Sequence, residues 1–328
     1  MSTIRFGIIR CDLHAIYYAN IMQPHDVTVL RDINYGKGGD YYFYQDYLQP
    51  EQLSFPIVPG FELTRVWSPI RQDAENMAKL YTSRPKVCET FEEVSDDVDL
   101  VLIANCDEDK AGSDHLEFAR PSIGKGVPTF IDKPMAYEVS DARTCVELAQ
   151  EHNTPILSLS ILREVPHVAR FRNRFAELGQ PQFALIKGGN YRMAGMVHAI
   201  SFAQHLFGPG VESVVSMGAE GKPFIIHLDY GDQADKPSSG VTLNCDVGDT
   251  YHCAIYASAY SSEGAIHSDR VSDFEFPWGV VEIVKKIKKM VETRTPQAPY
   301  DEMVENIAVG TAARKSLEES RRVRLSEV

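Results

Sequence analysis

The chain opens with the run Ile4-Arg-Phe-Gly-Ile-Ile9, whose apolar and β-branched side chains are typical of a buried strand. A helical pattern follows from Asp12 to Gln23, and Pro24 ends it. The apolar positions of this helix repeat at helical spacing, at Leu13, Ile16, Tyr17 and Ile21. A strand that leads directly into a helix is the first half of a βαβ unit, so the start of the chain predicts a parallel sheet covered by helices.

The same alternation continues through the first half of the chain. Strands are predicted at 61–67, 100–104 and 129–131, and helices at 73–81, 114–123 and around 142–149. Such an alternation implies right-handed crossovers and a doubly wound parallel sheet, which is an α/β fold. Residues 27–60 interrupt the alternation and are predicted to form an insertion.

From about residue 182 the pattern changes to strands that follow one another with turn-rich gaps. These strands are predicted at 183–187, 211–217, 223–230, 241–247 and 251–261, and helices near 163–178, 198–207, 278–292 and 300–320. We expect an α+β domain with a large open mixed or antiparallel sheet. We place the boundary after Pro134, which gives domains 1–134 and 135–328, and we expect the helix 300–320 to pack back on the first domain.

The composition is that of an ordinary globular protein, with 44% hydrophobic and 24% charged residues among 328. The 33 lysines and arginines and the 46 aspartates and glutamates give a net charge of -13. An acidic surface repels phosphate backbones and anionic lipid heads, so we expect neither nucleic acid nor membrane as a partner. The dense basic patch at 285–289 alternates with apolar residues, as the solvated face of an amphipathic helix does.

The sequence shows neither a charged leader with an apolar core nor an apolar run long enough to cross a bilayer, which predicts a cytoplasmic protein. The cysteines are scattered without a Cys-x-x-Cys pair, and we expect reduced core residues in place of a zinc site or a disulfide framework. They are Cys11, Cys88, Cys106, Cys145, Cys245 and Cys253.

Five segments occur in an informative order along the chain. They are Asp99-Leu-Val-Leu-Ile-Ala-Asn105, His115-Leu-Glu-Phe-Ala119, Gly126-Val-Pro-Thr-Phe-Ile-Asp132-Lys133-Pro134, His198 before a short helix, and Ala312-Ala313-x-x-Ser316. In this order the chain resembles the glucose-fructose oxidoreductase and inositol dehydrogenase family, written Gfo/Idh/MocA, over nearly its whole length apart from 27–60. The resemblance implies a Rossmann domain that binds NAD(P) and hydride transfer on a sugar, cyclitol or related polyol. It also implies a homodimer or homotetramer built through the C-terminal sheet.

Lys133 is the first predicted catalytic residue. A strand that ends in Asp132-Lys133-Pro134 places an ammonium at the carboxyl edge of a parallel sheet, where such folds open their ligand crevice. There Lys133 could hold a substrate hydroxyl or polarise a carbonyl. The resembling family usually has Glu where this chain has Asp132, and the shorter side chain need not reach the same partner. A surface lysine after a strand is the alternative interpretation.

His198 is the predicted proton-transfer residue, because imidazole titrates near neutrality and a hydroxyl that loses its proton needs a base within reach. The resembling family carries an aspartate four residues earlier, where this chain has Ala194. Asn190 and Arg192 are the candidates to take its place, but neither is a base at neutral pH. A structural role is the competing interpretation for His198. His205 stands seven residues on, and about 10 Å of helix rise between the two argues against a shared metal.

The expected phosphate-binding turn departs from the pattern of dinucleotide folds, which carry glycine at the first two key positions and glycine or alanine at the third. This chain has Arg10, Asp12 and Ala15 at those positions, and only Ala15 meets the requirement. Asp12 is a predicted N-cap whose carboxylate competes with the anion that a helix N-terminus attracts. Arg10 could offset this by contacting a phosphate. We therefore expect weakened or unusual cofactor binding at this turn, and a structural role is the simpler interpretation of His14.

A second cofactor determinant depends on which segment is strand two. If it is Phe61–Trp67, the ribose position falls on Ser68 with Arg71 close behind, which suits a 2′-phosphate and so NADP. If it is Val27–Leu30, Asp32 stands at the right distance and suits NAD. We prefer the first alignment, because the helix and strand that follow it are in the order a Rossmann half requires.

The predicted cofactor contacts lie in the turn after the first strand, at the end of strand two and in the segments that carry the resemblance. They are Arg10, Asp12, Leu13, His14, Ser68, Arg71, Asn105, His115, Asp132 and Lys133. No metal site is predicted. The insertion is rich in tyrosine between Tyr35 and Tyr47, and it is predicted either as a lid over the crevice or as a packed surface excursion.

Two functions of different class follow from these features. The first is an NAD(P)-dependent oxidoreductase in which Lys133 and His198 handle a substrate hydroxyl. The second is a pseudo-oxidoreductase that keeps the fold for ligand or partner binding or for non-redox chemistry. The missing glycines and Ala194 favour the second, whereas Lys133, His198 and the full-length architecture favour the first, which we prefer.

Overall fold

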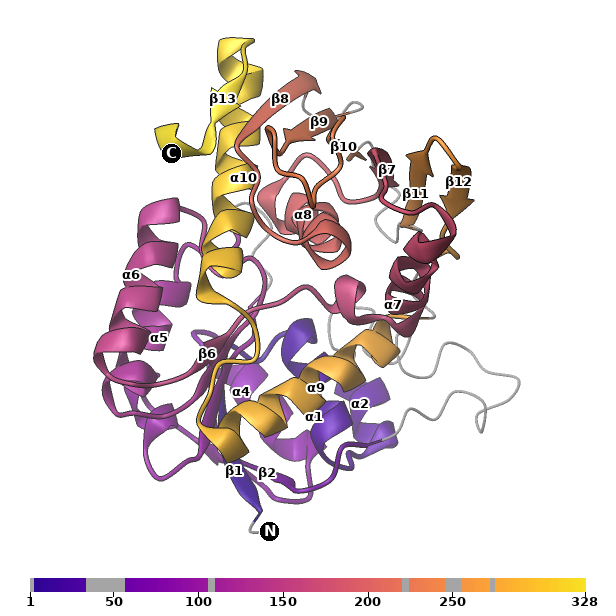
Figure 1. Cartoon of the computed structure of the whole chain (residues 1–328). Coiled ribbons are helices and arrows are strands. Elements are labelled where there is room, and N and C mark those ends of the chain that lie inside the picture. The colour runs from indigo at the N-terminus through magenta and orange to yellow at the C-terminus, as the bar shows by residue number, and fades with distance from the viewer. Residues whose placement is uncertain (1–2, 34–56, 106–109, 220–223, 246–254, 272–274) are drawn as a thin grey trace.

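The computed structural model describes residues 3–33, 57–105, 110–219, 224–245, 255–271 and 275–328, and it folds them around two β-sheets. In Figure 1 the first sheet and its helices occupy the lower part of the molecule, and the second sheet lies above them. None of the helices in these ranges is long and apolar enough to cross a membrane. The tyrosine-rich stretch 35–47, on which the lid hypothesis rests, lies outside the described residues.

The first sheet is parallel and six-stranded, in the order β3-β2-β1-β4-β5-β6. Its strands are β1 (Ile4–Ile9), β2 (Phe61–Trp67), β3 (Lys86–Val87), β4 (Leu100–Ile103), β5 (Thr129–Ile131) and β6 (Ile156–Leu157). Phe6 on β1 pairs with Leu63 on β2 and with Leu100 on β4, and all three side chains are fully buried. The predicted doubly wound sheet is confirmed. Its strand order reverses between β1 and β4, and such a reversal opens a ligand crevice at the carboxyl ends of the strands.

The helices of this unit are α1 (Leu13–Met22), α2 (Val27–Ile33), α4 (Arg71–Leu80), α5 (His115–Gly124) and α6 (Val139–Glu151). Residues 27–33 are helical because Asp26 Oδ1 accepts the backbone N–H groups of Thr28 and Val29, at 2.9 and 3.1 Å. The alternative in which Val27–Leu30 forms strand two is therefore wrong. Asp32 lies exposed on α2, and the preferred strand, Phe61–Trp67, pairs directly with β1.

The parallel sheet extends past the boundary that the sequence suggested. Thr129 and Phe130 on β5 pair with Ile156 and Leu157 on β6, so α6 and β6 complete the first unit. The predicted division after Pro134 falls inside this unit, before its last helix and strand. β6 is only two residues long, and so short a strand is defined by its pairing with β5 and not by a periodic pattern.

The second sheet is mixed and seven-stranded, in the order β12-β11-β7-β10-β9-β8-β13. Its strands are β7 (Phe183–Lys187), β8 (Ser213–Gly218), β9 (Phe224–Asp229), β10 (Val241–Asn244), β11 (Tyr256–Ser261), β12 (Gly264–His267) and β13 (Val323–Arg324). Only β7 and β10 pair in parallel among these strands, which confirms the predicted mixed sheet. One face of the sheet is covered by helices, and the other exposes the side chains of Leu185, Met217, Tyr256 and Tyr260.

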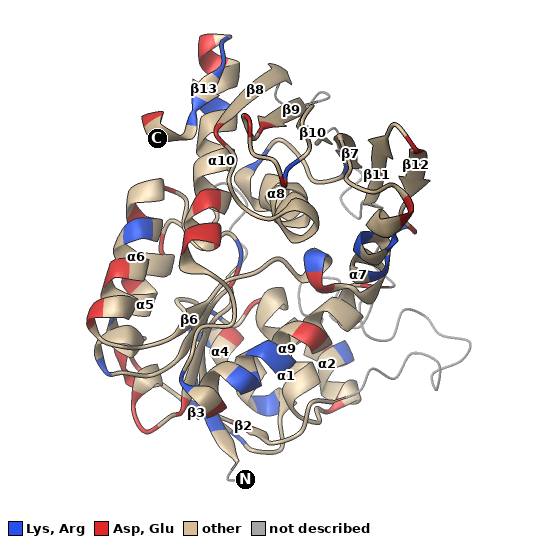
Figure 2. Ribbon diagram, viewed as in Figure 1, with Lys and Arg blue, Asp and Glu red and all other residues tan. Residues whose placement is uncertain are grey.

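The remaining helices are α7 (Pro166–Asn173), α8 (Met193–Phe207), α9 (Phe276–Thr293) and α10 (Tyr300–Glu319). α8 lies against β7 and β10, while α10 contacts α8, β8 and α6 and so joins the two units. α9 packs across α1 of the first unit (Figure 1). The lysines of α9 form a blue band in Figure 2, and its apolar side chains, Ile283 and Ile287 among them, are buried. The predicted amphipathic helix is confirmed.

The cysteines that the structure describes are buried free thiols, as predicted. Cys11, Cys88, Cys145 and Cys245 belong to this group, and burial raises the pKa of the Cys145 thiol to about 12. Cys106 and Cys253 lie outside the described residues.

Candidate functional site

Polar side chains follow three neighbouring strands at the carboxyl edge of the first sheet. Arg10 comes directly after β1, Asn105 closely follows β4, and Asp132 comes directly after β5. Because these strands are parallel and adjacent, the three residues lie at one edge of the sheet. This edge is where open α/β sheets bind their ligands.

Arg10 occupies the first glycine position of the turn between β1 and α1, with a left-handed φ of 71°. A glycine adopts this conformation without cost, whereas a side chain is strained by about 1 kcal/mol. The guanidinium is tied down, because Nη2 donates to Asn105 Oδ1 at 2.9 Å and Nη1 lies 3.8 Å from Asp114 Oδ2. Asn105 Nδ2 in turn donates to Asp114 at 3.0 Å. The turn keeps a glycine-like backbone, and its one cation is engaged by its neighbours.

Asp12 is the N-cap of α1, as predicted. Its Oδ1 accepts the backbone N–H of His14 at 3.0 Å, which is one of the donors that a pyrophosphate would use at this helix end. Leu13 begins the helix, and Ala15 is fully buried, so only the packing requirement of the third position is met. A carboxylate at the positive end of α1 repels an anion. The residues of this turn therefore do not fit the pyrophosphate of a nicotinamide dinucleotide in the usual manner.

Asp132 is the best-buried carboxylate of the site, with 1% of its surface exposed. The Nδ1 atom of His14 forms a short hydrogen bond with Asp132 Oδ2, and the hydroxyl of Tyr18 donates to Oδ1 at 2.8 Å. Burial alone would raise the pKa of the Asp132 carboxyl, but His14, Lys133 and Tyr18 together lower it to about 2. Asp132 therefore stays ionised at neutral pH.

Lys133 is almost buried, and its Nζ donates to the carbonyl oxygen of Ala194 at 3.3 Å. Ala194 lies in the first turn of α8, so this bond joins the end of the parallel sheet to the second unit. His115 holds the backbone after Lys133 in place, because its Nδ1 donates to the carbonyl oxygen of Pro134 at 2.9 Å. His115 is fully buried, which lowers its pKa, so we interpret it as a structural residue that holds the segment with Lys133 and Pro134.

His198 lies on α8, and its Nδ1 forms a 2.7 Å hydrogen bond with the hydroxyl of Ser160. Burial lowers the pKa of His198 well below its usual range, and Lys133 and His14 lower it further while Asp132 opposes them. The imidazole is therefore neutral, and it lies within electrostatic range of the other three groups. Asn190 does not stand in for the missing aspartate, because its Oδ1 accepts the backbone N–H of Arg192 at 2.8 Å.

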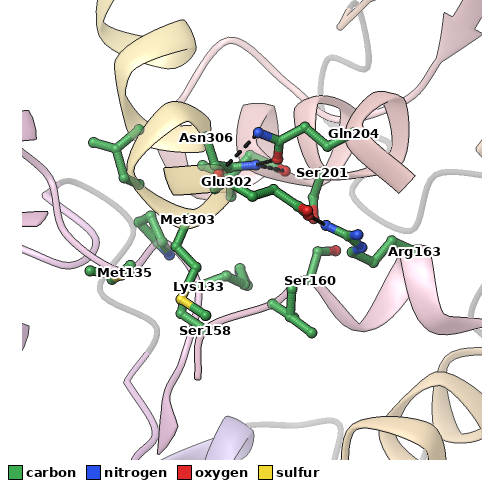
Figure 3. Close-up of a pocket in the computed structure, with 14 residues that line it drawn as sticks. Lys133, Met135, Ser158, Ser160, Arg163, Ser201, Gln204, Glu302, Met303 and Asn306 are labelled. Carbon is green, nitrogen blue, oxygen red and sulfur yellow. Dashed lines mark hydrogen bonds and ion pairs between the residues drawn. The ribbon is translucent and has the colours of Figure 1, made fainter. Parts of the chain in front are cut away.

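A small cavity lies beside Lys133, between the sheet edge, α8 and α10 (Figure 3). Its volume of about 20 Å³ has room for one water molecule. Arg163 and Glu302 form a buried ion pair on its wall, and Gln204 Nε2 donates to the backbone oxygen of Glu302 at 3.0 Å. Ser160, the partner of His198, also lines the cavity. Polar side chains of both units thus line the cavity beside Lys133.

Residues 36–159 match the family model GFO_IDH_MocA, described as "Oxidoreductase family, NAD-binding Rossmann fold". Over these residues the chain resembles the Gfo/Idh/MocA family. The family match begins after the β1–α1 turn and ends just beyond β6. No curated protein matches the chain in sequence.

Solved structures share the fold of this chain over nearly its whole length. The scyllo-inositol dehydrogenase from Lactobacillus casei, solved with NAD(H) and scyllo-inositol, is 12% identical with a TM-score of 0.74, covering 99% of this chain and 100% of that one. The myo-inositol dehydrogenase from Corynebacterium glutamicum ATCC 13032 is 14% identical with a TM-score of 0.73, covering 98% of this chain and 99% of that one. At these identities the likeness establishes the fold alone.

The family description names NAD, and nothing supports the predicted preference for NADP. Arg71, to which a 2′-phosphate was assigned, is exposed and forms ion pairs with Glu75 at 3.2 Å and Glu89 at 3.0 Å. Ser68 is buried after β2. The charge of Arg71 is thus already balanced by two carboxylates.

The sequence interpretation missed three partners of the predicted site residues. Tyr18 lies one helical turn after His14, on the same face of α1, so helical spacing alone could have indicated it. Ser160 and Asp114 carry no such signal, because each meets its partner through the tertiary fold. The charges of Lys133, Asp132 and His14 all act on the His198 imidazole. Arg71 lies on α4 and forms an ion pair with Glu75.

Proposed function

We propose that this protein acts on a hydroxyl group of a sugar, cyclitol or related polyol, with Lys133 and His198 at the reacting oxygen. The observation that carries the proposal is the bond from Lys133 Nζ to the first turn of α8, the helix that holds His198. This bond brings the ammonium of the first unit to the helix of the second unit that carries a neutral imidazole. Such a pair can hold and polarise a hydroxyl group.

The roles of the two residues follow from their partners. Lys133 presents donors only, so it binds a substrate oxygen and stabilises negative charge on it. His198 Nδ1 is bonded to Ser160, which leaves Nε2 as the ring nitrogen that can meet the hydroxyl. Burial around both side chains strengthens these interactions by excluding water.

The class of substrate and the redox cofactor are inferred from the family. Two similar structures are inositol dehydrogenases, and one of them was solved with scyllo-inositol and NAD(H). Hydride transfer to NAD is the activity expected of a Gfo/Idh/MocA enzyme. The Asp12 carboxylate does not favour a dinucleotide at the β1–α1 turn. The residues of this chain therefore support the proton transfer from the substrate hydroxyl more than they support the hydride transfer to a cofactor.

The same Asp12 contact favours a second candidate function. If no nicotinamide cofactor binds, the protein is a polyol-binding protein of the same fold, or an enzyme of non-redox chemistry at a hydroxyl. Lys133 and His198 would be used in either case.

One titration separates the two candidates. The purified protein is titrated with NADH and with NADPH while the fluorescence of the nicotinamide is followed, and calorimetry measures the binding of scyllo-inositol, myo-inositol and glucose. Micromolar binding of a nicotinamide cofactor together with polyol binding supports the oxidoreductase. Polyol binding without cofactor binding at millimolar concentration supports the second candidate, and no binding of any polyol contradicts both.

We also propose that two copies associate through the open face of the second sheet. Leu185, Met217, Tyr256 and Tyr260 are large apolar side chains exposed on this face, and contiguous exposed apolar side chains mark interaction sites on globular proteins. Light scattering after size-exclusion chromatography should show a dimer or tetramer. A Met217→Lys variant should shift it toward the monomer, and an unchanged mass would place the interface elsewhere.

A further inference from the structure

His198 is a poor proton acceptor on its own. Burial and the neighbouring Lys133 ammonium disfavour a positive charge on its imidazole, and Ala194 leaves it without the expected carboxylate on its own helix. A base that takes a proton from a hydroxyl becomes a cation, and a partly buried cation needs a counter-charge. The His198 imidazole therefore stays neutral and is a weak base.

A different histidine at the same crevice has the missing counter-charge. His14 Nδ1 is bonded to the Asp132 carboxylate, which stays ionised because its pKa is lowered to about 2. The Tyr18 hydroxyl holds the second carboxylate oxygen at 2.8 Å. With Nδ1 facing Asp132, the His14 ring directs Nε2 away from the buried carboxylate, and the side chain retains 12% exposure.

The surroundings of His14 place it among the reacting groups. Asp132, which is bonded to His14, precedes Lys133 in sequence, and Lys133 Nζ donates to Ala194 on α8, the helix that holds His198. The His14 ring is held by stacking on Tyr17, with 5.3 Å between ring centroids. Asp12 caps the same helical turn through the backbone of His14, which fixes the position of the imidazole.

We infer that His14 is the proton-accepting residue of this site, oriented by Asp132, and that His198 orients the substrate. In the proton transfer the O–H bond of the substrate hydroxyl breaks, its electron pair stays on oxygen, and an N–H bond forms at His14 Nε2. Asp132 stabilises the resulting imidazolium, and Lys133 stabilises the alkoxide. The assignment rests on the proposed function, because it needs a hydroxylated ligand in the crevice.

The test uses wild-type protein labelled with ¹⁵N-histidine. The ring signals of His14 are assigned through its stacking neighbour Tyr17, and scyllo-inositol, myo-inositol and glucose are added while calorimetry measures their binding separately. The expected result is that a bound polyol shifts the Nε2 signal of His14 and leaves the signal of exposed His152 in place. Binding without a shift at His14 overturns the assignment and leaves the proposed function standing. Absence of binding by all three polyols contradicts the proposed function and the assignment with it.

A kinetic arm follows if turnover of a polyol is detected. His14→Gln keeps a donor toward Asp132 but cannot accept the proton, so kcat should fall at least about 100-fold while KM changes little. The matched control His152→Gln removes an exposed imidazole and should leave both constants unchanged. A rise in KM with unchanged kcat in His14→Gln would show that His14 only binds the substrate, and it would refute the proton-accepting role.

Discussion

Lys133 Nζ donates a hydrogen bond to the carbonyl oxygen of Ala194 at 3.3 Å, across 61 residues of sequence. This contact fixes the distance between the edge of the parallel sheet and the first turn of α8. It follows that the proposed substrate site is assembled from both units and depends on their relative position.

Lys133→Met should lower turnover of a polyol by about 10²- to 10⁴-fold, because it removes the cation that stabilises charge on the substrate oxygen. The variant keeps most of the side-chain volume, so the melting temperature should change little. Steady-state kinetics and thermal unfolding measure the two effects. Lys236→Met is a matched control, since Lys236 also donates to a backbone carbonyl, that of Phe207, at 2.9 Å. Equal activity in the two variants would remove Lys133 from the mechanism.

Asp12→Asn should strengthen the binding of NADH by about tenfold or more. Asparagine caps a helix as well as aspartate does, so the substitution removes the charge that repels a pyrophosphate and keeps α1 intact. Nicotinamide fluorescence measures the affinity, and circular dichroism checks the helix content. Asp301→Asn, at the exposed start of α10, serves as a control for net charge. If the affinity for NADH is the same in wild type and Asp12→Asn, the carboxylate does not limit cofactor binding.

The elements that carry a local pattern could be predicted from the sequence. β1, α1 and the Asp12 cap follow from apolar spacing and from the capping preference of a single residue, and the structure has them in place. β6 could not be found in this way, because its two residues are a strand only through their pairing with β5. The predicted division after Pro134 missed the last strand of the unit for this reason.

The candidate site shows the same difference between local and tertiary information. Lys133 and His198 were indicated by short segments of sequence, whereas the partners that set their chemistry lie far along the chain. Asp132 meets His14 across 118 residues, and Ser160 meets His198 across 38. A residue type in a pattern can predict a role, but burial and charge around it depend on the completed fold.

Glu302→Gln should destabilise the protein by about 3 kcal/mol, because it leaves the buried Arg163 guanidinium without its closest carboxylate. Urea denaturation measures the loss. The double variant Arg163→Met with Glu302→Met should recover most of it, since well-packed apolar groups replace a buried ion pair without much cost. Glu177→Ala breaks the exposed pair with Arg174 and should cause no measurable change. A Glu302→Gln variant as stable as wild type would mean that Glu164, 3.5 Å from Arg163, supplies enough compensation.

His205 should make the protein sensitive to mild acid. Burial, with Arg163, Arg172 and Lys286 nearby, lowers its pKa from 6.5 to about 3 in the folded state. The folded pKa lies below the unfolded one, so the stability from this group is complete above pH 6.5 and is lost as the pH falls toward 3. The loss approaches about 1.4 kcal/mol per pH unit in that window. Urea denaturation at pH 7, 6 and 5 should show a smaller decline for His205→Gln than for wild type, and His152→Gln should match wild type. Parallel declines in all three proteins would show that His205 is protonated equally in the folded and unfolded chains.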